Sequence, residues 1–405
     1  MTRSVIVNPR RRALLAATAL AAAGALTLTA CGGDADANGD KKGANSAAKG
    51  ADITISSKDG VTDASINHTG VKVKNGKLTS VKMTSVTSGT AVEGTISGDG
   101  TSWKPKVQLE RGTKYKVTAN AKDPKGNAAT ENATFTTVST ANSFIGSYTP
   151  DGGTTVGVGM PVSFNFDKPI TEKKDVQSHI TVTSTSGQKV VGHWFGNQRL
   201  DFRPEEYWKA GSKVTMKIDL DGVKGANGIT GVQKKTVTFT VGRAQVSTVD
   251  VNTKKMTVER DGKVIKTIPI SAGSPSNPTY NGKMVISEKF TQTRMNGDTV
   301  GFGGEYDIKD VPHAMRLSTS GTFIHGNYWG SPSVFGSANT SHGCVGLQDA
   351  RGAGDPNTMG AWFYNNSLIG DVVTVKGSPD KTIAPDNGLN GWNMSWSEWT
   401  AGSAV

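Results

Sequence analysis

One cysteine and two histidines share a short stretch of this chain. Residues 325–347 read HGNYWGSPSVFGSANTSHGCVGL, and Cys344 is the only cysteine beyond position 31. A catalytic cysteine reacts as its thiolate and needs a nearby base. His342 lies two residues earlier, about 7 Å away along an extended chain, whereas His325 follows a strand-like segment and can fold back onto the thiol. Gly343 lets the backbone N–H groups at 343 and 344 approach an oxyanion. The pattern predicts cysteine acyl-transfer chemistry with His325 as the base.

The N-terminus predicts export. Four arginines precede the apolar run ALLAATALAAAGALTLTA, which stops at Cys31. A basic segment, a short apolar segment and small residues form a secretory signal. LTAC, at 28–31, resembles the lipobox of bacterial lipoproteins, which implies a signal peptide over 1–30, a diacylated Cys31 and a flexible tether over 31–50. The mature chain is then expected on the outer face of the cytoplasmic membrane, next to the cell wall. An ordinary signal peptide with a chance cysteine is the alternative, and the export route, general or twin-arginine, stays open.

Composition narrows the possible functions. With Cys31 lipidated or removed, Cys344 has no disulfide partner, so it is either a buried apolar residue or a reactive thiol. The formal net charge is +11, which includes the signal arginines, and runs such as VKVKNGKLTSVK are typical of solvated strand faces. An exported chain of this kind is not expected to bind nucleic acid. The six histidines are scattered and no cluster has metal-ligand spacing, so we expect no metal and no cofactor.

The elements that must position this chemistry are mostly β-strands. The chain has 50 glycines and short runs of alternating Thr, Ser, Val and Lys, as half-buried strands require. SWKPKVQLERGTKYKV, from Ser102, and DFRPEEYWKAGSKVTM, from Asp201, form an internal repeat. We therefore expect two tandem immunoglobulin-like β-sandwiches at 51–140 and 141–242. The isolated histidines within them, His68, His179 and His193, are expected to be surface or packing residues.

A third, β-rich domain is expected over 243–377. The Asp261-Gly262 pair predicts a hairpin, and strands are expected around 283–287, 316–317, 322–324 and 370–377. One short helix is expected over 355–368, with Asp355 as its N-cap and Pro356 at its first position. The tail, 378–405, is rich in tryptophan. We expect it to pack back onto the third domain and the second sandwich, with an aromatic platform for glycan strands as the alternative.

FIHGN followed by TSHGCVGL closely resembles the active-site signature of the L,D-transpeptidases with a YkuD-type catalytic domain. The resemblance extends to the lipobox, the Ig-like pair and a tail, NGWNMSWSEWTAGSAV, like that of the mycobacterial-type enzymes. It implies that Cys344 is the acylated nucleophile and His325 its base, with the ring oriented by the main-chain carbonyl of Gly326, a role that any residue could fill. His342 matches a structural, hydrogen-bonding histidine, with Ser341 beside it.

The resemblance also implies substrate contacts. Tyr306 matches a tyrosine on a flap over the donor pocket, and Met295 matches an apolar flap residue. Trp329, in the loop after His325, is expected at the substrate with them and with Ser341. One position departs from the family pattern, because Gly346 stands where Asn or Arg is usual. That departure puts an acceptor-side contact in doubt.

The reaction that the resemblance implies joins peptidoglycan stem peptides. Cys344 attacks the third residue of a tetrapeptide stem and releases D-Ala, and an amine of a neighbouring stem takes the acyl group to give a 3→3 cross-link. Carbapenems are the expected inhibitors. Two alternatives remain open: an L,D-carboxypeptidase that uses water as acceptor, and a wall-binding lipoprotein without activity.

Overall fold

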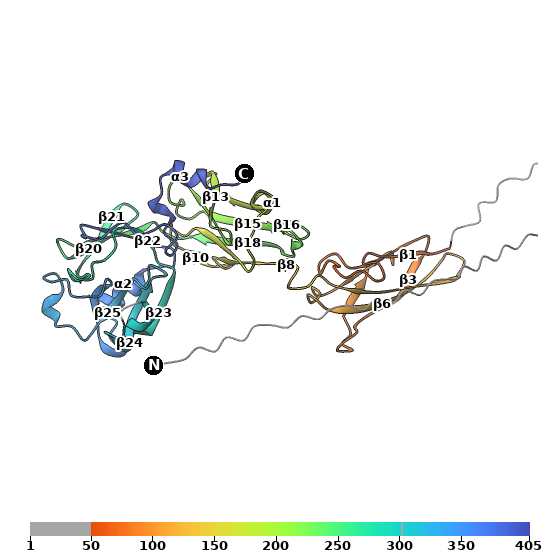
Figure 1. Ribbon diagram of the computed structural model, residues 1–405, viewed down its shortest axis with the longest axis horizontal. Coiled ribbons are helices and arrows are strands. Elements are labelled where there is room, and N and C mark those ends of the chain that lie inside the picture. The colour runs from red at the N-terminus through yellow and green to blue at the C-terminus, as the bar shows by residue number, and fades with distance from the viewer. Residues whose placement is uncertain (1–49, 301–302) are drawn as a thin grey trace, which may run out of the picture. The chain divides into compact units, whose positions relative to one another are not determined.

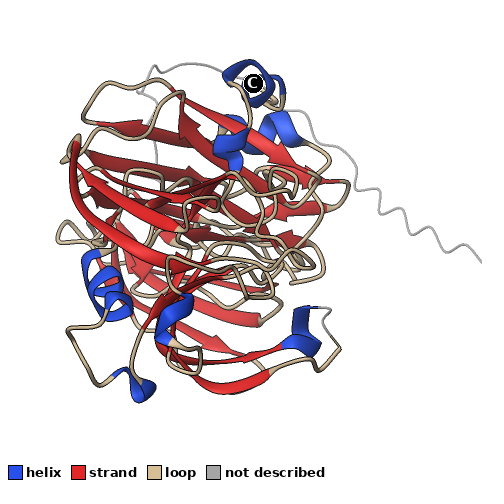
Figure 2. Cartoon of the chain, turned by 90° about the vertical axis from the view of Figure 1, so that its left-hand side faces the viewer, coloured by secondary structure: helices blue, strands red, loops and turns tan. Residues whose placement is uncertain are grey.

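The computed structural model describes residues 50–300 and 303–405 (Figure 1). Strands dominate this part of the chain and the helices are short, as Figure 2 shows. The mostly β fold class predicted from sequence is therefore confirmed. The expected signal peptide, Cys31 and tether fall outside the described residues. No helix in the described ranges is long and apolar enough to cross a membrane.

Two sheets pack into the first sandwich. In β6 (Lys114–Lys122) buried and less buried positions alternate, and the buried set includes Tyr115 and Val117, because successive side chains point to opposite faces. Trp103 and Phe135 fill the core between the sheets. One sheet has the order β1 (Asp52–Ile55), β2 (Val71–Lys74), β5 (Ser102–Pro105), β4 (Gly94–Ile96), and the other β3 (Lys77–Ser85), β6 (Lys114–Lys122), β7 (Ala128–Thr136).

The second sandwich repeats this arrangement. Its sheets have the orders β13 (Val190–Phe195), β14 (Arg199–Pro204), β11 (Val162–Phe166), β9 (Gly146–Thr149) and β10 (Thr155–Val156), β18 (Lys234–Val241), β15 (Lys213–Asp219), β12 (Ile180–Ser184). A small sheet of β16 (Lys224–Ala226), β17 (Ile229–Gly231) and β8 (Ser143–Phe144), and helix α1 (Lys173–Ser178), complete it. The sequence repeat corresponds to this topology, because β5, β6 and β7 hold the same places in the first sandwich as β14, β15 and β18 in the second.

A nine-stranded mixed sheet follows. Its order is β22 (Gly282–Val285), β27 (Val372–Lys376), β19 (Gln245–Asp250), β20 (Lys255–Arg260), β21 (Lys263–Ser271), β26 (Val345–Gln348), β25 (Phe323–Asn327), β24 (Asp307–Arg316), β23 (Glu288–Asn296). The expected hairpin at Asp261-Gly262 joins β20 to β21. The sequence prediction missed β23, β26 and most of β24. Strand β23 is an edge strand with few buried positions, so it lacks the apolar alternation that identifies a strand.

The predicted helix starts later than expected. Helix α2 spans Met359–Asn366 with Thr358 as N-cap, whose side chain accepts from the N–H of Ala361. The Asp355 carboxylate instead accepts from the N–H of Asn357, within the preceding turn. The prediction that Asp355 caps this helix was therefore wrong. The other short helices are η1 (Gly297–Val300), η2 (Pro332–Val334), η3 (Arg351–Ala353), η4 (Gly391–Asn393) and α3 (Trp396–Ala401).

The C-terminal tail packs against both the second sandwich and the nine-stranded sheet. The indole N–H of Trp392 donates to the carbonyl of Gly159 at 2.7 Å, and Asn393 pairs with the backbone of Lys283. Trp399 is fully buried and stacks on His193, with ring centroids 4.8 Å apart. These contacts confirm that the tail docks, and they make His193 a packing histidine. The guanidinium of Arg203 lies over three indoles of the tail, those of Trp392, Trp396 and Trp399.

Candidate active site

Two neighbouring parallel strands bring the predicted base and nucleophile together. Strands β25 and β26 pair so that Ile324 lies opposite Val345 and His325 opposite Gly346. Cys344 directly precedes β26, so it comes beside the start of β25. Sequence reasoning expected His325 to fold back onto the cysteine from another strand, and this register is how the chain achieves it.

Both side chains line one cavity of about 260 Å³. The other predicted residues with a place in its wall are Tyr306, Met295, Ser341, His342 and Trp329. Sequence reasoning missed Ser271, Ile308, Asn327 and Thr340, which also line it. Asn327 and Thr340 lie at the edges of the FIHGN and TSHGCVGL segments, whereas no local motif marks Ser271 and Ile308, which reach the cavity from β21 and β24.

The ring of His325 is fixed on both sides. Its Nδ1–H donates to the carbonyl of Gly326 at 2.8 Å, which leaves the lone pair on Nε2. Its face stacks on the indole of Trp329, with centroids 5.6 Å apart and planes 13° apart. Burial lowers the pKa of His325, while the Gly326 hydrogen bond and the charge of Asp349 oppose that shift in part. The imidazole is therefore neutral at neutral pH and can accept a proton at Nε2.

Cys344 rests as a thiol. Its Sγ donates to the carbonyl of Gly321 at 3.6 Å, and burial raises the pKa of the thiol to about 11. A thiol with this pKa is almost entirely protonated at neutral pH. Nucleophilic attack then requires that a base remove the proton as the sulfur–carbon bond forms.

A tight turn holds the loop before Cys344. The Ser341 hydroxyl donates to the carbonyl of Cys344 at 2.5 Å and accepts from the N–H of Gly343 at 3.2 Å. Gly343 has a φ of +106°, a backbone conformation that residues with a side chain rarely adopt. The Gly343 N–H, expected to be available to an oxyanion, thus already has an acceptor in this structure, and an oxyanion there would replace a long hydrogen bond.

His342 and Tyr306 meet above this loop. The Nε2 of His342 lies 2.9 Å from a carboxylate oxygen of Glu305, and its ring centroid is 5.1 Å from that of Tyr306. Burial raises the pKa of Tyr306 to about 12, so the phenol stays protonated. Both contacts tie the cysteine loop to the segment just before β24.

Two glycines beside the site have different surroundings. The Gly326 carbonyl accepts from His325 as expected, but a Cβ on Gly326 would lie 2.0 Å from Oδ2 of Asp349, so a side chain at this position would clash. A Cβ on Gly346 would lie 3.4 Å from the carbonyl of Ser271 and 3.6 Å from Asn327, which is ordinary contact. The departure at Gly346 therefore leaves room in the cavity wall without straining the backbone.

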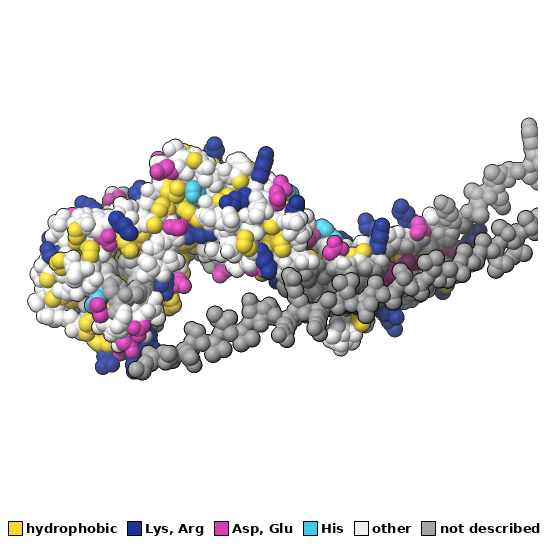
Figure 3. All heavy atoms as spheres, viewed as in Figure 1, with side chains coloured by type: hydrophobic (Ala, Val, Ile, Leu, Met, Phe, Trp, Pro, Cys, Tyr) yellow, Lys and Arg dark blue, Asp and Glu magenta, His cyan; other side chains and the backbone are white. Residues whose placement is uncertain are grey.

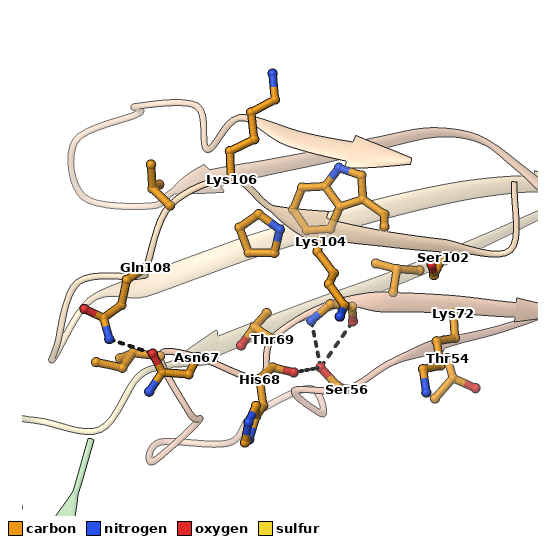
Figure 4. Close-up of a pocket in the computed structure, with 16 residues that line it drawn as sticks. Thr54, Ser56, Asn67, His68, Thr69, Lys72, Ser102, Lys104, Lys106 and Gln108 are labelled. Atoms are coloured by element: carbon orange, nitrogen blue, oxygen red, sulfur yellow. Dashed lines mark hydrogen bonds between the residues drawn. The ribbon is translucent and has the colours of Figure 1, made fainter. Parts of the chain in front are cut away.

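A larger cavity, of about 660 Å³, lies in the first sandwich (Figure 4). The Ser56 hydroxyl in its wall donates to the backbone carbonyls of His68 and Gly70. Within the described residues the cavity offers no nucleophile paired with a base, so size does not identify the reactive site.

On the face seen in Figure 3, basic and acidic side chains are interspersed rather than gathered by sign. In the described ranges no three His, Cys, Asp or Glu side chains are grouped to hold a metal ion.

Comparison with known proteins decides the family. L,D-transpeptidase 2 of Mycobacterium tuberculosis is 32% identical over 356 residues, which are 87% of this chain and 85% of that protein. The chain belongs to the L,D-transpeptidases. The model of the L,D-transpeptidase catalytic domain matches residues 244–375, and that of a bacterial Ig domain matches 62–224. L,D-transpeptidase 5 of the same species is 29% identical over 83% of this chain and 73% of its own.

Solved structures of L,D-transpeptidases are also similar to this chain. An LD transpeptidase in complex with imipenem is 28% identical, with a TM-score of 0.48, and the match covers 57% of this chain and 97% of that one. L,D-transpeptidase 3 from M. tuberculosis with a faropenem-derived adduct is 25% identical, with a TM-score of 0.46, over 59% of this chain and all of its own. The similarity to L,D-transpeptidase 2 and the match to the catalytic-domain model make the present chain an L,D-transpeptidase enzyme, an acyltransferase.

Proposed function

We propose that this L,D-transpeptidase forms 3→3 cross-links between peptidoglycan stem peptides through an acyl-enzyme on Cys344. The observation that supports this most directly is the pairing of β25 with β26, which puts a neutral His325 and the Cys344 thiol in one cavity. Family membership supports the reaction class, and the geometry supports the assignment of Cys344 as nucleophile and His325 as base. No metal or cofactor takes part in the proposed reaction.

The first step is acylation. Nε2 of His325 takes the thiol proton as Sγ of Cys344 attacks the carbonyl carbon of the third stem residue. The tetrahedral oxyanion is stabilised by N–H groups of the loop at 343 and 344. As it collapses, the imidazolium returns the proton to the departing amine of D-Ala, and a thioester remains on Cys344.

The second step is transfer to an acceptor. The side-chain amine of a third residue on another stem attacks the thioester and gives a proton to His325, and the sulfur leaves and regains a proton. Two cavities meet at the loop: one of about 290 Å³ is lined by His342 and Gly343, and it shares His342 with the wall of the first. We assign the first cavity, with Tyr306, Met295 and Trp329, to the donor stem. The second gives an acceptor a separate approach, which favours transfer over hydrolysis.

Incubation with disaccharide-tetrapeptide substrates, followed by mass spectrometry of the products, tests this function. We expect dimers joined 3→3 and free D-Ala from the wild type, and neither from Cys344→Ala. His325→Ala should slow acylation by roughly a hundredfold or more, whereas the exposed His179→Ala in the second sandwich should match the wild type. A carbapenem should add the mass of one drug molecule at Cys344. Tripeptides without dimers would indicate a carboxypeptidase, and turnover by Cys344→Ala would refute the mechanism.

We further propose that Cys31 is diacylated and holds the enzyme on the outer face of the cytoplasmic membrane. The support is the LTAC sequence at the end of an apolar segment. Metabolic labelling with a radioactive fatty acid should mark the wild type and not Cys31→Ala, which should also be released from the membrane fraction. Equal labelling of both proteins would contradict the anchor.

A further inference from the structure

A buried carboxylate lies behind the proposed base. Asp349 directly follows β26 and is 9% exposed. It accepts three hydrogen bonds: from Nδ1–H of His313 at 2.8 Å, from the N–H of Ala350 at 2.8 Å and from the Thr358 hydroxyl at 2.7 Å. The two-step reaction described above leaves this carboxylate without a role.

The carboxylate packs against the residue that orients the base. A Cβ on Gly326 would lie 2.0 Å from Oδ2 of Asp349, and a Cβ on Gly360 would lie equally close. The two glycines therefore form a slot that only a chain without side chains at these positions can provide. Because the Gly326 carbonyl accepts from Nδ1–H of His325, the charge of Asp349 lies one peptide unit behind the ring.

His313 holds the carboxylate from the neighbouring strand. It is 5% exposed on β24, and its ring lies against Tyr364 with centroids 5.1 Å apart. Its φ of +49° is in the left-handed region, which is uncommon for a residue with a side chain. Strained conformations of this kind persist where surrounding contacts hold them and are frequent near active sites.

The proposed reaction requires a negative charge near the ring of His325. In both steps His325 becomes an imidazolium inside a buried site, and burial alone disfavours that cation. Other titratable groups that line the cavity are Cys344, Tyr306 and His342, and His342 has its own carboxylate partner in Glu305. Asp349 is the carboxylate whose charge acts on the ring of His325, where it opposes the effect of burial.

We propose that Asp349, held in place by His313, is a positioning residue of the acyl-transfer site: it fixes the Gly326 carbonyl and stabilises the imidazolium form of His325. The proposal rests on the assignment of Cys344 and His325 in the proposed function. The proposed site then runs from the thiol through the His325 imidazole and the Gly326 carbonyl to the carboxylate of Asp349. No motif in the sequence marks this carboxylate.

Carbapenem acylation of Cys344 provides the test. For Asp349→Asn, the maximal acylation rate should fall roughly ten- to a hundredfold, as loss of outer hydrogen-bonding partners does elsewhere, while the half-saturating drug concentration stays within about twofold. Loss of the negative charge lowers the pKa of His325 further, so the acid-side midpoint of the rate should move to lower pH. Thr358→Ala is the matched control, because it removes a hydrogen bond to the same carboxylate and the cap of α2 but keeps the charge. It should lower Tm with little effect on rate or midpoint.

An Asp349→Asn protein whose rate and pH midpoint equal those of Thr358→Ala would overturn the proposal and leave Asp349 a structural role. Circular dichroism and Tm would show whether this variant folds. If it does not, His313→Gly decides, since glycine adopts the left-handed backbone readily and has no side-chain donor for Asp349, while the carboxylate keeps its charge. Slower acylation by a protein that circular dichroism shows to be folded is then expected, and an unchanged rate overturns the proposal. Failure of the proposed function would appear differently, as a wild-type protein that the drug does not acylate at Cys344.

Discussion

At the scale of single residues, the protonation state of His325 determines the pH range of acylation. The base must be neutral to accept the thiol proton, and burial lowers its pKa below the ordinary value of 6.5. Acylation should therefore persist as pH falls through 6.5 and decline only through the lowered pKa. The rate of carbapenem adduct formation, measured from pH 4.5 to 9 by mass spectrometry, checks this. Tm over the same range is the control, and an acid-side midpoint at or above 6.5 would contradict it.

The two glycines that flank Cys344 should respond oppositely to substitution. Gly343→Ala forces a side chain onto a φ of +106° and should lower the free energy of unfolding by about 1–3 kcal/mol, with slower acylation because the turn shifts. Gly346→Ala finds ordinary contact distances and should change stability by less than about 0.5 kcal/mol. Denaturant unfolding and acylation rates of both variants test the pair. Equal losses would mean that backbone conformation at 343 does not matter.

The sequence predicts some site residues and not others for a physical reason. Cys344, Ser341, His342 and Gly343 form a contiguous motif, and His325 closes the strand-like segment before the same loop. Asp349 and His313 belong to the site only because β24, β25 and β26 pair in one register. Sequence reasoning had no signal for that register, since β26 is four residues long and was not predicted as a strand.

At the scale of elements, alternation predicted strands well wherever one face is buried. In β6 and β15 buried and less buried positions alternate, and the repeat placed them correctly. The strands that the sequence prediction missed do not alternate in this way. Strand β26 is buried along most of its length and β23 has no fully buried position, so neither shows the period of two by which a half-buried strand is recognised.

The start of α2 provides a prediction at this scale. Thr358 caps the helix through its hydroxyl and also bonds Asp349, whereas Asp355 bonds only within the exposed turn before it. Thr358→Ala should cost about 1 kcal/mol of unfolding free energy, within the usual range for a lost cap, and Asp355→Ala less than about 0.5 kcal/mol. Chemical denaturation of both variants checks the ranking. A larger loss for Asp355→Ala would restore the cap assignment made from sequence.

At the scale of the whole molecule, the tail links the catalytic sheet to the second sandwich. Asn390 bonds the backbone of Val285 and Leu317, which belong to the nine-stranded sheet and the turn after β24. Trp392 and Trp399 bond backbone carbonyls of the second sandwich. Among the tail indoles lies Arg203, whose pKa burial lowers to about 10. Removing the tail would expose this cation together with the surface that the tryptophans cover.

Deletion of residues 388–405 should therefore lower Tm and increase protease sensitivity at the junction of the sandwich and the sheet, with activity falling as a consequence. Trp399→Ala alone should cost about 3–5 kcal/mol, the usual cost of truncating a fully buried aromatic side chain, because Trp399 has no exposed surface. Ser397→Ala, on the exposed side of α3, is the matched control and should leave Tm unchanged. If the truncated enzyme melts like the full chain and resists protease equally but binds purified cell wall less, the tryptophans act as a glycan platform. Docking would then not be their function, because contacts that stabilise a junction cannot be removed without lowering its free energy of unfolding.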